Sequence, residues 1–232
     1  MTVPVRHVVY LHGFASSPES SKAEVFRRGL AAAGVGFVSP DLNQPEFETL
    51  TTTRMLTQVR AVIEGIPEGP VALVGSSLGA FVAVLAADAD LTGRVDRLIL
   101  LAPALDFGGN RLRQFGPHSV EAWRQAGALR VPHHAWGEER EINFALYEDA
   151  AQYDAITLPV RFPTLVFQGE YDEVVKPAMV KQWAAGRPMV DLRLLPDGHQ
   201  LSTSIERVWR ESARFLGVAG GPTEGLRAVP QS

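Results

Sequence analysis

Short apolar segments alternate with longer helix-like segments along most of this chain. The apolar segments consist almost entirely of hydrophobic residues, which is typical of strands that are buried on both faces of a sheet. They lie at residues 5–11, 35–40, 70–75, 95–102, 162–169 and 190–196. Helices are predicted at residues 20–33, 50–64, 78–89, 177–185 and 202–216. This alternation predicts an α/β fold with a doubly wound, mostly parallel sheet of about six strands.

Several of the predicted helices carry end signals. Ser21 and Glu24 have the spacing of a capping box, in which a serine begins a helix and a glutamate three residues later completes the cap. Gly34 and Gly65 follow helical segments, and glycine commonly ends a helix. These signals support the helix bounds given above.

Residues 103–157 break the alternation, because they are too long for an ordinary connection and contain no clear apolar strand run. Short helices are predicted near residues 119–126 and 142–153. The segment is rich in aromatic residues, namely Phe107, Phe115, Trp123, Trp136, Phe144, Tyr147 and Tyr153. We interpret it as a cap, in which these residues with His133 and His134 form a small core rather than a substrate pocket.

A length of 232 residues fits one compact domain better than two small ones. We expect this domain at residues 1–216, with the cap insertion at about 103–157. Residues 217–232 are rich in glycine and proline and lack periodicity, which predicts a flexible tail.

The formal net charge is −4 and the basic residues are scattered, so no surface suited to nucleic acid is expected. Cysteine is absent, which excludes disulfides, a thiolate nucleophile and thiolate metal ligands. The first residues lack a signal-peptide pattern, and no apolar run approaches the roughly 18 residues of a membrane span. We therefore expect a cytoplasmic protein.

Residues 75–79 have the sequence GSSLG and lie between an apolar strand and an apolar helix. This is the G-x-S-x-G pattern of a nucleophile elbow, a sharp strand-to-helix turn that exposes its central serine. Small residues at both ends of the pattern let the strand and helix approach, which selects Ser77 rather than Ser76. The helix start also lets the backbone N–H of Leu78 stabilise a developing oxyanion.

A serine hydroxyl is a poor nucleophile at neutral pH, so a base must take its proton. His199 follows the strand predicted at 190–196, which places it at the same carboxyl edge of the sheet as Ser77. The other histidines considered lack that position: His12, His118, His133 and His134. His199 is therefore the predicted general base.

The carboxylate that orients this histidine is expected after the preceding strand. Asp172 is the best placed, because it follows the strand predicted at 162–169. Glu170 and Glu173 are close competitors, whereas Asp197 is too near His199 in sequence to reach around its ring. The chain order Ser, Asp, His is that of α/β-hydrolase sites.

A second oxyanion donor is expected from the loop after the first strand. That strand leads directly into His12 and Gly13, and the histidine side chain is expected to have a structural role there. We assign the donor to the backbone N–H of Phe14, with Ala15 as the alternative.

These motifs resemble those of the α/β-hydrolase superfamily, specifically a small esterase-like group that opens with YLHGF and SSP. They are YLHGF at 10–14, SSP at 16–18, SSKA at 20–23, GSSLG at 75–79, GEYDEVV at 169–175 and DGHQ at 197–200. The resemblance implies an esterase or related acyl hydrolase without a cofactor. It places the nucleophile, acid and base on Ser77, Asp172 and His199, and the oxyanion donors on Phe14 and Leu78. Many members of the superfamily begin with an antiparallel hairpin, whereas the first strand here begins within ten residues, so we expect a reduced version of the fold.

Three functions stay open from the sequence. The first is hydrolysis of a carboxylic ester or related small acyl substrate through an acyl-enzyme. The second uses the same triad for thioester or carbon–carbon bond hydrolysis, or for perhydrolysis. The third is a non-catalytic small-molecule receptor on the same fold. No metal site is expected, because the carboxylates and histidines show no ligand spacing.

Overall fold

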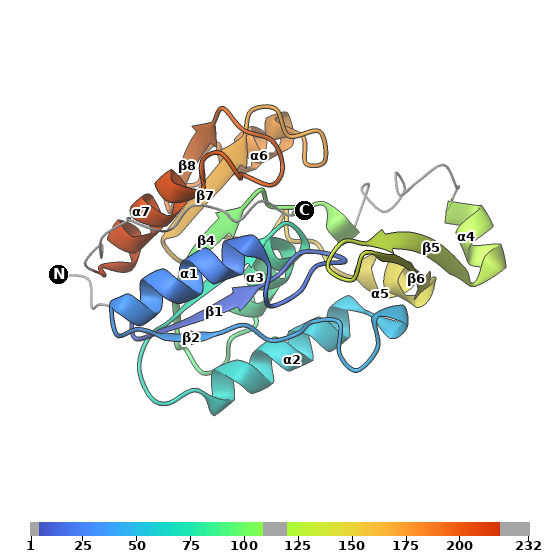
Figure 1. Ribbon diagram of the computed structural model, residues 1–232, viewed down its shortest axis with the longest axis horizontal. Coiled ribbons are helices and arrows are strands. Elements are labelled where there is room, and N and C mark those ends of the chain that lie inside the picture. The colour runs from blue at the N-terminus through green and yellow to red at the C-terminus, as the bar shows by residue number, and fades with distance from the viewer. Residues whose placement is uncertain (1–4, 109–119, 219–232) are drawn as a thin grey trace.

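The computed structural model describes residues 5–108 and 120–218, and a six-stranded parallel sheet forms its centre (Figure 1). The strands are β1 His7–Leu11, β2 Gly36–Val38, β3 Val71–Ser76, β4 Val95–Leu101, β7 Thr164–Gly169 and β8 Val190–Leu195. Their order is β2-β1-β3-β4-β7-β8, and each neighbouring pair is parallel. The predicted doubly wound sheet of about six strands is confirmed.

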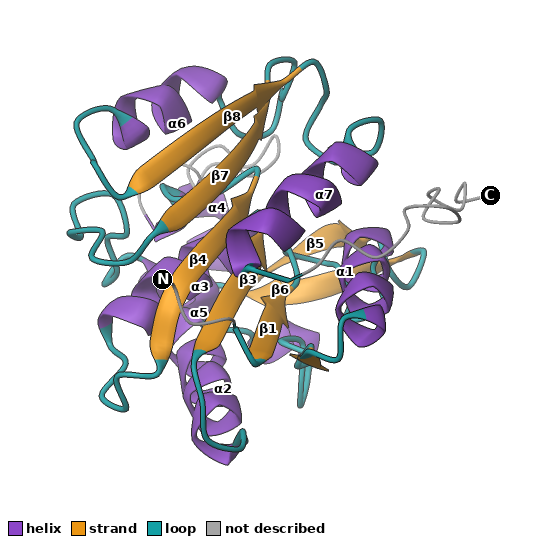
Figure 2. Cartoon of the chain, turned by 90° about the vertical axis from the view of Figure 1, so that its left-hand side faces the viewer, coloured by secondary structure: helices purple, strands orange, loops and turns teal. Residues whose placement is uncertain are grey.

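Five helices cover the two faces of this sheet. They are α1 Ser21–Ala32, α2 Thr52–Gly65, α3 Leu78–Asp88, α6 Pro177–Ala184 and α7 Ile205–Leu216. Figure 2 shows α1 and α7 on one side of the sheet and α2, α3 and α6 on the other. Within β1, Val8 and Tyr10 belong to the core under α1 and α7, whereas Val9 and Leu11 belong to the opposite core. Both faces are therefore apolar, which explains the nearly continuous apolar runs.

The strand order reverses direction at β1. The chain passes from β1 through α1 to β2 on one side, and then through α2 to β3 on the other side of β1. The helices after β1 and β3 consequently lie on opposite faces of the sheet, and open α/β sheets commonly bind ligands at the carboxyl ends of the strands where the order reverses in this way. The loops after β1 and β3 meet at this edge.

The start of α1 differs by one residue from the prediction. Ser20, not Ser21, is the N-cap, and its side-chain oxygen accepts a hydrogen bond from the N–H of Ala23 at 3.4 Å. The Glu24 carboxylate does not complete a capping box, because it accepts hydrogen bonds from Arg27 on the helix surface. Two adjacent serines made the cap ambiguous in the sequence.

The insertion contains two strands that the sequence analysis did not predict. It comprises α4 Val120–Ala126, β5 Ala128–His133, β6 Glu138–Asn143 and α5 Ala145–Ala150, and β5 and β6 form an antiparallel hairpin. The predicted helix at 119–126 is present from residue 120, whereas the one at 142–153 is wrong at its start, since residues 142 and 143 belong to β6. Only one face of the hairpin is buried, through Val131 and Ile142, so neither strand is a continuous apolar run.

The insertion lies at the carboxyl end of the sheet, at the right of Figure 1. Its short helix α5 contacts α2, and its hairpin contacts the 3-10 helix η1 Phe47–Thr49. The division into a domain at 1–216 and a cap at about 103–157 stays a prediction. Phe115, His118 and nearly all of the predicted tail lie outside the described residues. No helix within the described ranges is long and apolar enough to cross a membrane.

Candidate functional site

Ser77 occupies a strained turn between β3 and α3. Its backbone has φ 54° and ψ −113°, a conformation that non-glycine residues rarely adopt. A Cβ at Gly75 would lie 2.4 Å from the carbonyl oxygen of Gly79, and a Cβ at Gly79 would lie 2.0 Å from that of Leu11. The two glycines therefore let α3 pack directly against β3 and β1. This close packing forces the turn that presents Ser77 at the sheet edge.

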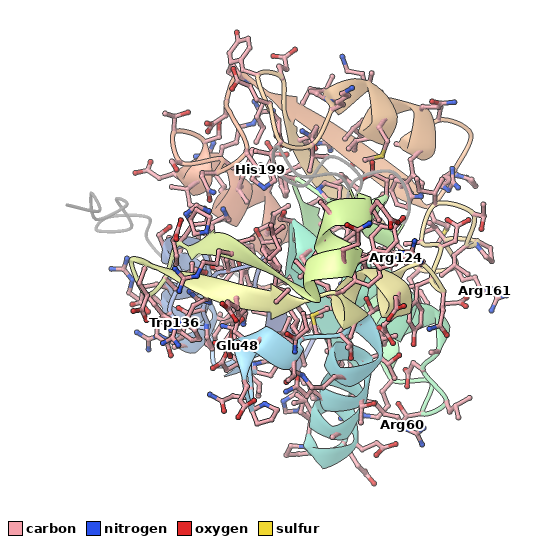
Figure 3. All side chains as sticks on the ribbon, turned by 90° about the vertical axis from the view of Figure 1, so that its right-hand side faces the viewer. Glu48, Arg60, Arg124, Trp136, Arg161 and His199 are labelled. Atoms are coloured by element: carbon pink, nitrogen blue, oxygen red, sulfur yellow. The ribbon has the colours of Figure 1, made fainter. Side chains whose placement is uncertain are left out.

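The structure brings Ser77, His199 and Asp172 together. The Nε2 atom of His199 lies 3.0 Å from the Oγ atom of Ser77, and its Nδ1 atom lies 2.9 Å from Oδ2 of Asp172. The three residues follow β3, β8 and β7, so side chains far apart in sequence converge at one edge. Figure 3 shows His199 on the same side of the molecule as the β5–β6 hairpin. The arrangement can pass a proton from Ser77 to an imidazole that a carboxylate orients.

Asp172 is buried and holds its negative charge through several donors. Its Oδ1 atom accepts hydrogen bonds from the N–H groups of Val174 at 2.8 Å and Val175 at 2.7 Å. Its Oδ2 atom accepts one from Nε2 of Gln168 at 2.9 Å and faces His199. Burial alone would raise the pKa of Asp172, but the hydrogen bonds from His199, Val175 and Gln168 hold it below its ordinary value. The carboxylate is therefore ionised and fixed.

The competing carboxylates lie elsewhere. Glu170 and Glu173 are exposed, and neither is bonded to His199. Asp197 accepts hydrogen bonds from the N–H groups of Gly198 and Ser204, both at 2.8 Å, and so braces the loop that carries His199. The structure brings only Asp172, of the carboxylates considered in the sequence, to the imidazole.

The other described histidines do not reach Ser77. His12 is buried, its Nδ1 atom donates to the carbonyl oxygen of Gly13 and its Nε2 atom accepts from the N–H of Leu42 at 3.0 Å. It therefore ties the loop after β1 to the segment after β2. His133 is buried in the hairpin and stacks on Trp136, whereas His134 is exposed.

The predicted oxyanion donors border Ser77. Leu78 is the first residue of α3, where a backbone N–H has no acceptor within the helix. In the loop after β1, a Cβ at Gly13 would lie 3.5 Å from Cβ of Ser77, so this loop passes directly beside the serine. Phe14 and Ala15 follow, and Ala15 has φ 54°. The assignment of Phe14 or Ala15 as the second donor stays a prediction.

Backbone strain gathers at this edge of the sheet. Within residues 5–108 and 120–218, the non-glycine residues with positive φ are Ala15, Ser77, Ala102 and Leu201. They follow β1, β3, β4 and β8, each near the carboxyl end of its strand. Strained residues persist only where their surroundings hold them, and they cluster at functional sites.

Gln168 is a site residue that the sequence analysis missed. Gln168 is fully buried near the end of β7. Its amide nitrogen donates to Oδ2 of Asp172, whereas the backbone N–H groups of Val174 and Val175 donate to Oδ1. The available signal was a single amide residue in the apolar strand TLVFQG, four residues before the aspartate. A polar residue inside such a strand indicates a buried hydrogen-bond partner.

No group of three or more His, Asp or Glu side chains in the described part of the chain could hold a metal ion. The groups able to act chemically at the site are the hydroxyl, imidazole and carboxylate described above. Electrostatic help comes from the start of α3, whose N–H groups carry partial positive charge.

A model of the uncharacterised protein family UPF0227 matches residues 7–210. No curated protein matches the chain. Among solved structures, alpha/beta hydrolase domain-containing protein 10 from mouse has a TM-score of 0.74 at 22% identity, covering 94% of this chain and 92% of that one. Est1E from Butyrivibrio proteoclasticus, with ferulic acid bound, has a TM-score of 0.79 at 18% identity, covering 92% and 88%. An esterase from Pyrococcus furiosus has a TM-score of 0.67 at 14% identity, covering 92% and 82%. These similarities confirm the fold that the motifs indicated.

Proposed function

Because the chain belongs to the uncharacterised protein family UPF0227 and has the α/β-hydrolase fold, we propose that it is a serine hydrolase acting on carboxylic esters. The observation that carries this proposal is the continuous hydrogen-bonded series from Ser77 through His199 to Asp172 at a strained elbow. A receptor would not need an activated serine, so the intact series favours catalysis.

In the first half-reaction, His199 Nε2 takes the proton of Ser77 while Oγ attacks the carbonyl carbon of the ester. Nδ1 of His199 keeps its proton, because the buried Asp172 carboxylate accepts it as a hydrogen bond. The tetrahedral oxyanion lies toward the N–H groups of Leu78 and of Phe14 or Ala15. The imidazolium then protonates the alkoxy oxygen of the ester as its bond to the carbonyl carbon breaks, so the alcohol departs and an acyl group remains on Ser77.

In the second half-reaction, the neutral imidazole of His199 removes a proton from water, and the resulting hydroxide attacks the acyl carbonyl. Collapse of the second tetrahedral intermediate returns the proton to Ser77 and releases the carboxylic acid. Asp172 remains ionised throughout and stabilises the imidazolium. Every group in this reaction belongs to the chain, the ester or water, so the proposed mechanism needs no cofactor.

A small ester is the proposed substrate class. Est1E, which has this fold, carries ferulic acid in its structure, and the Pyrococcus furiosus protein is named an esterase. The aromatic ring of Phe14 packs within 5.3 Å of Phe47 and 6.5 Å of Phe107 between ring centroids, so the loop beside Ser77 has an apolar backing. Such a backing suits the acyl part of an ester better than a charged group.

The test is hydrolysis of short-chain and long-chain p-nitrophenyl esters by the wild type, Ser77→Ala and Ser76→Ala. The expected result is ester turnover in the wild type, its loss in Ser77→Ala, and its retention in Ser76→Ala. The neighbouring serine is a matched control, because it immediately precedes Ser77 as the last residue of β3 but its hydroxyl is not bonded to His199. Turnover that survives in Ser77→Ala contradicts the proposed nucleophile.

Thioester and β-diketone substrates, and peroxide with an acyl donor, belong in the same panel. If the enzyme turned over one of these substrates faster than every ester, the proposed triad would stand but the proposed reaction would be replaced by that one. A folded wild type that binds these compounds and turns none of them over would instead support a receptor.

A further inference from the structure

Lys22 is a buried cation beside the proposed active site that the mechanism does not use. It is the second residue of α1, and 8% of its surface is exposed. Its Nζ atom donates to the main-chain oxygen of Gln200 at 3.1 Å and to the side-chain Oε1 of the same residue at 2.8 Å. Both acceptors belong to the residue that immediately follows His199.

This placement costs stability. Burial disfavours a charged ammonium group, and a positive charge near the start of a helix opposes the helix dipole. Within the described residues, no carboxylate oxygen lies within 4.0 Å of the Lys22 amine to offset that cost. Burial lowers the pKa of Lys22 to about 8, although Asp197 and Asp172 act in the opposite direction. An apolar side chain of similar length would serve packing alone at least as well.

The hydrogen bonds of Lys22 complete the support of the loop that carries His199. Asp197 fixes the start of that loop through the N–H groups of Gly198 and Ser204. Leu201, which follows Gln200, has a strained backbone with φ 54°. Between these points the N–H of Leu201 donates to the carbonyl oxygen of Gly198 at 3.2 Å, and Gln200 itself is held by the amine of Lys22, which projects from α1.

We propose that Lys22 is a positioning residue, which fixes the backbone at Gln200 and thereby holds the His199 imidazole between Ser77 and Asp172. This inference rests on the proposed serine hydrolase function. Proton transfer depends on the 3.0 Å approach of His199 to Ser77, and a displacement of about 1 Å can lower a rate by roughly 10²-fold. Lys22 touches none of the reacting atoms, so it acts through the loop.

The test is Lys22→Met, with Lys181→Met as the matched control. Methionine keeps the length and removes the donors and the charge; Lys181 is an exposed lysine on α6. We expect Lys22→Met to lower kcat by about 10- to 100-fold with little change in KM, and to leave Tm unchanged or higher. Lys181→Met is expected to change neither kcat nor KM.

Gln200→Ala is a second variant. The side chain of Gln200 is exposed, so we expect this variant to fold like the wild type. It removes one of the two acceptors and keeps the main-chain oxygen, so its kcat is expected to lie between those of wild type and Lys22→Met. In the Lys22→Met background the same change is expected to have no further effect on kcat, because the partner amine is already absent.

A readout that needs no turnover keeps this inference separable from the proposed function. The Nδ1 proton of His199, bonded to Asp172, gives a downfield proton NMR signal that is identified by its loss in His199→Gln. We expect this signal to shift or broaden in Lys22→Met and to persist in Lys181→Met. An inactive wild type would refute the hydrolase function. The NMR signal alone would then test whether Lys22 positions His199. A Lys22→Met variant with wild-type kcat and an unchanged signal overturns the inference, as does a loss of kcat that only follows a loss of Tm.

Discussion

The carboxyl edge of the sheet and the insertion beside it are held in different ways. At the sheet edge, buried polar groups have several partners each, as Asp172 has with Val174, Val175 and Gln168. The insertion has an aromatic interior, in which Trp123 packs on Phe144 and His133 stacks on Trp136. It is joined to the rest of the chain by apolar packing, as between His133 and Phe47, and by hydrogen bonds near the surface.

Two of these surface contacts are well defined. The Asp149 carboxylate of α5 accepts a hydrogen bond from the N–H of Thr53 at the start of α2, at 2.9 Å. The N–H of Ala135, at the turn of the hairpin, donates to the carbonyl oxygen of Ala15 at 3.3 Å. Because the groups proposed to react are held by these buried hydrogen bonds at the sheet edge, we expect substitutions there to alter the reaction rate. Changes in the insertion should alter stability and access.

Asp172→Asn is expected to have the largest effect. An asparagine favours the wrong tautomer of His199, and the same change in a serine protease lowers kcat by about 10⁴-fold. Steady-state kinetics with circular dichroism would separate a loss of rate from a loss of fold. Glu173→Gln, the equivalent change at the exposed next residue, is the control and should retain activity. A near-normal rate in Asp172→Asn would remove this residue from the proposed triad.

Gly79→Ala tests the packing that creates the elbow. The new Cβ would lie 2.0 Å from the carbonyl oxygen of Leu11, and overpacking of this kind typically lowers the free energy of unfolding by about 1–3 kcal/mol. Urea denaturation measures the change. Gly65→Ala at the end of α2 is the control, because its Cβ would meet nothing within 4 Å. Equal stabilities of the two variants would show that the elbow is not tightly packed.

Asp149→Ala removes the hydrogen bond between α5 of the insertion and the start of α2. Loss of a side-chain cap at a helix start costs about 1 kcal/mol, so Tm should fall slightly while kcat stays near the wild-type value. Glu148→Ala, at the exposed neighbouring position of α5, should leave Tm unchanged. A large fall in kcat for Asp149→Ala would mean that the insertion takes part in positioning the triad.

The smallest expected effect is a dependence of stability on pH. Burial lowers the pKa of His133, and the positive charge of Arg140 acts in the same direction. The unfolded chain then binds a proton at about pH 6.5 and the native state only at lower pH, so stability falls as pH drops below about 6.5. The lowered pKa of Asp172 instead makes its contribution complete above about pH 3.9, and the contribution is lost as pH falls further toward the lower pKa of the native state. As pH falls, the insertion should therefore lose stability at a higher pH than the carboxyl edge of the sheet does.

Thermal unfolding at about pH 7.5 and about pH 5 measures this difference. His133→Phe keeps an aromatic ring and should lose less Tm on acidification than the wild type does. His134→Phe is the control, since His134 is exposed and its substitution should leave the pH dependence of Tm unchanged. Identical pH dependence in wild type and His133→Phe would contradict a buried neutral imidazole.

The sheet was predictable from sequence because its inner strands β1, β3, β4 and β7 are covered on both faces, which leaves nearly continuous apolar runs. The hairpin β5–β6 was not, since charged residues such as Arg130 and Glu141 alternate with its buried ones. Ser77 and His199 could be proposed from local motifs at strand ends. Gln168 and Lys22 were missed, because their role depends on contacts with Asp172 and Gln200 that only the folded chain creates.

The role proposed for Ser77 is tested most directly by mass-spectrometric labelling with a fluorophosphonate, a reagent that reacts with activated serine nucleophiles. The prediction is that the wild type carries one label, on the peptide that contains Ser77, and that folded Ser77→Ala carries none. A folded wild type that stays unlabelled, or a label that persists in Ser77→Ala, would contradict the claim that Ser77 is an activated nucleophile.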